Sequence, residues 1–169
     1  MPDVRCNFNA STAKNKMNSV MTISQYLNRI IGTSFGKNYL QISIKKSFES
    51  RNFQSFWRNW NPVVGYYLAK YINKPILKMS NASISSFFTF LISGFLLHDL
   101  WFMPILYLLT NKLFWFPVTI IFLTYWLIML VENKINFRNK IKSTKKHIII
   151  NIFYVIGGSI LGGLISSLI

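Results

Sequence analysis

The chain has 169 residues, of which 51% are hydrophobic, 17% aromatic and only 14% charged. Soluble domains carry roughly 25% charged residues, so this composition excludes an ordinary soluble fold or a disordered chain and predicts a membrane protein. Lys and Arg number 19 against 4 Asp and Glu, a net charge of +15. Because the cations lie between hydrophobic runs, they favour anionic lipid or an anionic substrate, and we expect no nucleic-acid partner.

Residues 1–50 are polar and basic, and their one amphipathic stretch runs from Met21 to Ile31. The first twenty residues contain no apolar run, so we expect no cleaved signal peptide. The single cysteine, Cys6, cannot form a disulfide within the chain. We therefore predict a polar N-terminal segment, 1–50, followed by a membrane domain, 51–169.

The membrane domain begins with an aromatic and basic segment, 53–78, that is too polar to cross a bilayer. It is typical of an interfacial or re-entrant amphipathic helix, with aromatic rings at headgroup depth. Its lysines are expected to extend toward lipid phosphates. These lysines are Lys70, Lys74 and Lys78.

Three hydrophobic runs follow, at 83–109, 113–131 and 148–169, each long enough to span a hydrocarbon core of about 30 Å. The sequence thus predicts an all-α integral membrane protein with about three transmembrane helices and one interfacial helix. The loop 132–147 carries most of the cations between spans, which places it in the cytoplasm by the positive-inside rule. In the last span, small residues predict a face for close helix packing, which is a candidate contact surface for a larger membrane partner. They are Gly157, Gly158, Gly162 and Gly163.

His98 lies near the middle of the first predicted span. An ionisable residue at that depth is costly, so it is either a neutral histidine bonded to another helix or to water, or a functional group. Asp99 is next to it, but adjacent helical positions point about 100° apart and do not pair. We expect Asp99 to form an ion pair with a cation elsewhere or to be held neutral.

The second notable cluster is the run Phe56-Trp57-Arg58-Asn59-Trp60-Asn61-Pro62. Taken alone, it is typical of an aromatic belt, in which Asn61 caps a helix that begins at Pro62.

Together, the two clusters resemble the membrane-bound O-acyltransferase family. Members of this family carry a Phe-Trp-Arg-x-Trp block followed by Asn or His, and later a histidine inside a hydrophobic helix. Phe56, Trp57, Arg58 and Trp60 match the block, Asn61 occupies the polar position, and His98 matches the histidine, over roughly 32–101. Family members are longer, so the resemblance implies a short or truncated member. The sequence around the motifs resembles that of bacterial proteins. This resemblance implies a location in the bacterial inner membrane.

The resemblance implies transfer of an acyl group from a thioester, acyl-CoA or an acyl-carrier thioester, to a hydroxyl of a lipid or polysaccharide. His98 is the expected base and Asn61 the group that orients substrate or oxyanion, both classed as catalytic. Trp57 and Trp60 are expected to line the acyl channel, and Arg58 to meet phosphates. No bound cofactor is implied.

Two other interpretations stay open. A non-catalytic small membrane protein, which anchors or packs against a larger partner, requires neither Asn61 nor His98. A transporter subunit uses His98 and Asp99 along a proton path. The sequence contains no phosphate-binding loop, paired-cysteine zinc site or nucleophile elbow, and we expect no metal site.

Overall fold

The computed structural model describes residues 22–32, 36, 38–111 and 116–168, so the predictions for 1–21, Cys6 included, lie outside this part. Within it the chain forms helices and no strand, which confirms the all-α prediction. Two short segments, η1 (Ala69–Asn73) and η2 (Phe95–Asp99), are π-helical, and η3 (Phe137–Lys140) is a 3-10 turn. The elements are α2 (Ile23–Ile31), α3 (Tyr39–Phe48), α4 (Phe53–Trp60), α5 (Pro62–Leu68), η1 (Ala69–Asn73), α6 (Lys74–Met79), α7 (Ala82–Gly94), η2 (Phe95–Asp99), α8 (Leu100–Thr110), α9 (Pro117–Ile135), η3 (Phe137–Lys140) and α10 (Thr144–Leu168).

Among the described residues, three helical segments are long and apolar enough to cross a membrane: Ala82–Thr110, Pro117–Ile135 and Thr144–Leu168. The first joins α7, η2 and α8, and the others are α9 and α10. The prediction of about three helices able to cross a membrane is confirmed. Their ends differ by a few residues from the predicted runs, of which 113–115 and 169 lie outside the described residues.

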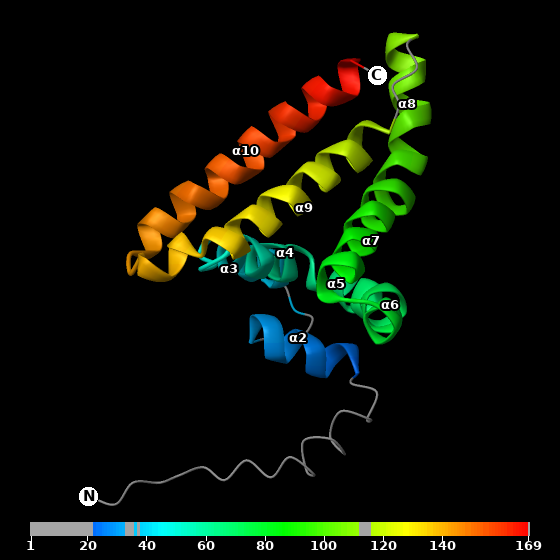
Figure 1. Ribbon diagram of the computed structural model, residues 1–169. Helices are drawn as coiled ribbons and strands as arrows, with labels where there is room; N and C mark the ends of the chain where they lie inside the picture. Colours follow the sequence, from blue (N-terminus) through cyan, green and yellow to red (C-terminus); the bar gives the residue numbers. More distant parts are fainter. Residues whose placement is uncertain (1–21, 33–35, 37, 112–115, 169) are drawn as a thin grey trace, which may run out of the picture.

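The short helices α2 to α6 gather at one end of the long helices, beside the start of α7, the end of α9 and the start of α10 (Figure 1). The segment predicted as one interfacial helix, 53–78, is divided at Asn61 into α4 and a continuous run of α5, η1 and α6. Pro62 explains the break, because its ring disfavours a helical conformation at the preceding residue and suits the first turn of a helix. Asn61 caps α5 as predicted, its side-chain oxygen accepting a hydrogen bond from the Val64 N–H at 3.3 Å.

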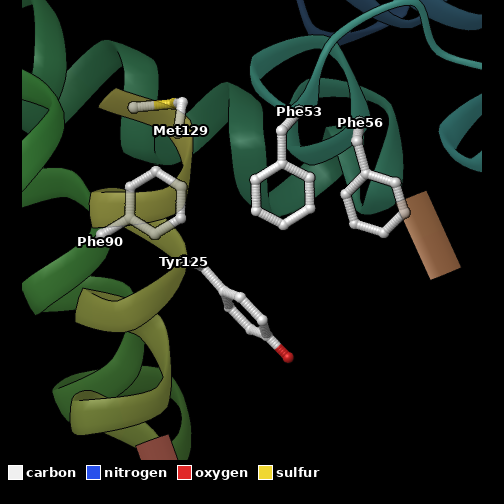
Figure 2. Close-up of a cluster of buried hydrophobic side chains, with 5 residues drawn as sticks. All are labelled: Phe53, Phe56, Phe90, Tyr125 and Met129. Carbon is white, nitrogen blue, oxygen red and sulfur yellow. The ribbon is translucent and has the colours of Figure 1, made fainter. Parts of the chain in front are cut away.

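An aromatic core joins α4 to the long helices. It contains Phe53 and Phe56 of α4, Phe90 of α7, and Tyr125 and Met129 of α9, all buried. Figure 2 shows the two phenylalanines of α4 side by side, with ring centroids 5.4 Å apart. The Tyr125 hydroxyl points away from these rings (Figure 2) and lies 3.1 Å from the Val155 carbonyl oxygen of α10. Burial of this cluster fixes α4 against α7 and α9.

Glycines bring α9 and α10 into close contact. A Cβ at Gly158 would lie 2.6 Å from the Tyr125 ring, and one at Gly162 would lie 2.7 Å from the Ile121 Cα. By contrast, a Cβ at Gly157 or Gly163 would meet none of the described residues within 4 Å. The four glycines expected to share one partner surface therefore do not lie on one face, since Gly157 and Gly163 each point about 100° away from the neighbouring glycine that contacts α9. Gly158 and Gly162 are used within the chain.

A buried polar network fixes the start of α4. Glu132 accepts a hydrogen bond of 2.7 Å from the Phe53 N–H, and its other oxygen pairs with Arg138 at 3.1 Å. Arg138 also donates to the Asn151 side-chain oxygen at 2.8 Å and to the Ser50 carbonyl at 2.9 Å. The Glu132 and Arg138 side chains are both only 2% exposed. Each charge is thus removed from water but is paired, as buried ions require.

Candidate active site

The side chains of α4, which carries the tryptophan block, point in three directions. Phe53 and Phe56 face the core, whereas Trp57 is half-buried and packs against Phe122 of α9, with ring centroids 5.4 Å apart. Arg58 points outward and is exposed, donating a hydrogen bond to the Ser55 hydroxyl at 3.2 Å. The indole Nε1 of Trp57 is buried and finds no hydrogen-bond partner among the described residues. A buried N–H without a partner is costly unless a ligand or water accepts a hydrogen bond from it.

His98 lies in the π-helical turn η2, within the first membrane-spanning segment. Its Nδ1 is 2.9 Å from the Ser93 carbonyl oxygen. A carbonyl only accepts, so the neutral ring carries its proton on Nδ1 and has a lone pair at Nε2. No group in the described part of the chain bonds this Nε2. The side chain is exposed, not buried as its place in the span suggested, because it faces a cavity.

Asp99 is fully buried, and the ion pair that we expected for it is not formed with any described residue. Its carboxylate accepts hydrogen bonds from the Val118 N–H at 3.0 Å and the Thr119 N–H at 2.8 Å, and from the Thr119 hydroxyl. These N–H groups belong to the first turn of α9, where no carbonyl of the helix can reach them and the helix dipole favours an anion. His98 therefore lines the cavity, whereas its neighbour Asp99 binds the first turn of α9. The two side chains do not pair, as their angular separation predicts.

A cavity of about 530 Å³ lies between the short helices and the first two spans. All five predicted site residues line it: Trp57, Arg58, Trp60, Asn61 and His98. The structure thus brings together two motifs that are far apart in the sequence. None of the described lining residues is acidic, so the cavity suits a neutral or anionic ligand. The remaining lining residues are Tyr26, Gln54, Val64, Gly65, Leu68, Ala69, Asn73, Ser86, Thr89, Phe90, Ser93, Leu97, Phe122 and Met129.

Two lining residues that sequence reasoning missed connect the site. The Phe122 ring packs against both Trp57 and His98, its centroid 5.0 Å from the imidazole. Tyr26 comes from the amphipathic helix α2 and packs edge-on against Tyr66 at 5.6 Å. Neither position carries a sequence signal, because an aromatic residue in an apolar or amphipathic helix is most often part of a core. Close packing behind His98 depends on Gly94, where a Cβ would lie 2.7 Å from the Thr119 Cα.

The cavity is lined by the His98 imidazole, which can accept a proton, and by two hydrogen-bond donors, the Asn61 amide and the Trp57 indole. This arrangement is suited to proton transfer. Among the described residues, no group of three or more His, Cys, Asp or Glu side chains could hold a metal ion. Comparisons with family models, curated proteins and solved structures find no match.

Proposed function

We propose that this protein is a membrane-embedded acyltransferase, which moves an acyl group from a thioester to a hydroxyl of a lipid or polysaccharide. The observation that carries the proposal is the position of His98, whose Nδ1 is bonded to the Ser93 carbonyl, on the wall of the cavity that Asn61 and the tryptophan block also line. The donor is acyl-CoA or an acyl-carrier thioester. The resemblance of the two motifs to those of membrane-bound O-acyltransferases supports the same reaction.

The reaction needs a base and an oxyanion donor. Nε2 of His98 takes the proton of the acceptor hydroxyl as its oxygen attacks the thioester carbon. The carbonyl oxygen becomes an oxyanion, then the C–S bond breaks and the proton passes to the leaving thiolate. Asn61 uses its side-chain oxygen to cap α5, so its Nδ2, which bonds no other described residue, can donate to that oxyanion.

The other predicted residues supply binding. Trp57 and Trp60 offer apolar walls to an acyl chain, while Arg58 offers a cation to the phosphates of a pantetheine donor. All described lysines and arginines belong to the end where the short helices gather (Figure 1). By the positive-inside rule this end, with loop 132–147, faces the cytoplasm, and we assign the protein to a bacterial inner membrane.

The proposal is tested with the full chain in liposomes, incubated with labelled short- and long-chain acyl thioesters. His98→Gln removes the base and is expected to lower transfer by about 10²- to 10⁴-fold. Asn61→Asp keeps the capping oxygen but loses the donor, with an expected loss of about 10²- to 10³-fold. Transfer at the wild-type rate by the folded His98→Gln protein would exclude the catalytic role.

The alternative is a non-catalytic protein that packs against a larger membrane partner. Gly157 and Gly163 favour it, because a Cβ at either position would meet none of the described residues within 4 Å. In that case no variant at Asn61 or His98 alters function, whereas a bulky residue at Gly157 disrupts partner binding.

A further inference from the structure

One side of the helix formed by α5, η1 and α6 is both basic and aromatic. We call it the basic–aromatic face; it comprises Tyr67, Lys70, Tyr71, Lys74 and Lys78. Tyr67 and Tyr71 are 50% and 60% exposed, and their rings stack with centroids 6.3 Å apart. Lys74 and Lys78 are exposed as well. The spacing of three and four residues puts these side chains on one stripe of a helix.

The opposite side of the same helix is fixed to the membrane domain. The Asn73 carbonyl accepts a hydrogen bond from the Ser85 hydroxyl of α7 at 2.7 Å. The Asn73 side-chain nitrogen donates to the Thr89 hydroxyl at 3.3 Å. Leu68 and Ala69 line the cavity. The helix therefore cannot roll, and its outer side is held in one orientation.

The charge of the face has no nearby acidic counterpart in the sequence. The chain contains no acidic residue between Glu49 and Asp99, and Asp99 is buried in η2, where it binds N–H groups of α9. The Lys70 ammonium lies over the Tyr71 ring, 5.0 Å from its centroid. Its interaction with the Tyr71 hydroxyl raises the pKa of Lys70, so this side chain stays positively charged.

The face also lies where a membrane surface is expected. Helix α6 ends at Met79, which is 90% exposed, and the first membrane-spanning segment begins at Ala82. Tyrosine rings and lysines near the end of a span are typical of the headgroup layer, where the ring partitions to the interface and the ammonium reaches phosphate.

We propose that the basic–aromatic face binds the headgroups of anionic phospholipids in the leaflet that surrounds this end of the protein. The lysines pair with lipid phosphates and the two tyrosine rings lie at the boundary of headgroup and acyl chain. A soluble phosphate would account for the lysines but not for the exposed rings, so we commit to lipid. The proposal does not depend on acyl transfer.

The test uses the full chain in phosphatidylcholine liposomes with a trace of spin-labelled phosphatidylglycerol or phosphatidylcholine. Electron paramagnetic resonance gives the ratio of their association constants. We expect the wild type to prefer phosphatidylglycerol, because each lysine near an anionic headgroup strengthens binding by about five-fold. Joint replacement of Lys70, Lys74 and Lys78 by Gln is expected to move the ratio toward one.

The matched control replaces Lys140, Lys142 and Lys145 by Gln. These three lysines are exposed and carry the same total charge as the three lysines of the basic–aromatic face. It is expected to keep most of the preference, as is the variant with Arg at positions 70, 74 and 78. Equal losses in both Gln variants, or no loss in the first, would overturn the proposal. Displacement of the labelled lipid by glycerol phosphate in solution would replace it with a soluble-phosphate site. Far-UV circular dichroism checks that each variant remains helical.

Discussion

The carboxylate of Glu132, near the end of α9, accepts a hydrogen bond of 2.7 Å from the backbone N–H of Phe53. Phe53 is the first residue of α4, so its N–H has no acceptor within its own helix. The other Glu132 oxygen pairs with Arg138 at 3.1 Å. One buried side chain thus joins the helix that carries the tryptophans to the second membrane span.

Removing Glu132 is expected to destabilise the whole protein. Glu132→Ala leaves the Arg138 guanidinium buried without its counter-ion, which lowers the free energy of unfolding by about 3 kcal/mol. Denaturant unfolding in micelles, followed by tryptophan fluorescence, measures the change. Glu49→Ala removes an equal charge from a half-buried side chain that makes no bond with the described residues, and its effect is expected to be small. Equal losses in the two variants would contradict this role.

The glycines of α10 provide a matched pair. Gly162→Ala places a methyl group 2.7 Å from the Ile121 backbone, so α9 and α10 must move apart and the protein loses about 1 to 3 kcal/mol. Gly163→Ala meets none of the described residues within 4 Å and is expected to be neutral or slightly stabilising. Thermal unfolding in detergent compares them. A loss at position 163 as large as that at 162 would show that this side of α10 is also occupied.

Asp99 is expected to hold the start of α9 in place. Asp99→Ala leaves the partly buried Val118 N–H and the buried Thr119 N–H without acceptors, at a cost of about 1 to 3 kcal/mol. Hydrogen exchange of these two amides is expected to accelerate. Asn81→Ala, which removes an exposed cap from α7, serves for comparison, with an expected cost of about 1 kcal/mol. Unchanged exchange at both amides would refute the capping role.

The pH dependence of stability is expected to report on Tyr26. Burial of its hydroxyl raises the pKa of Tyr26 above 10.0, against opposing effects of Arg58 and Arg29. The folded state therefore favours the neutral phenol, and this contribution is complete below about pH 10 and is lost as pH rises through the folded-state pKa. Tyr26→Phe should make the decline of stability at alkaline pH less steep. An unchanged slope in unfolding measurements would contradict this.

Membrane orientation is tested with single cysteines, after Cys6→Ser. Lys142→Cys lies between η3 and α10 at the basic end, and Thr110→Cys lies at the opposite end of the first span. We expect an impermeant thiol reagent added outside intact cells to label position 110 only. Labelling of position 142 from outside would reverse the topology.

Much of the fold follows from residues that are close in sequence. An apolar run long enough to cross a bilayer needs no distant partner to satisfy its backbone, which is why the three spans could be predicted from hydropathy. The cap at Asn61 and the helix start at Pro62 are equally local, since each involves atoms within one turn. The sequence by itself therefore determined the three spans, the break before α5 and the concentration of lysines and arginines outside the spans.

The tertiary structure decided which residues meet. Glu132 bonds a residue 79 positions away, Asp99 binds the start of another helix, and only two of the four glycines contact α9. The cavity shared by Asn61 and His98 likewise exists only because the aromatic core fixes α4 against α7 and α9. Hydropathy and helix periodicity carry no information on the rotation of one helix against another. That rotation is set by side-chain packing across the whole fold.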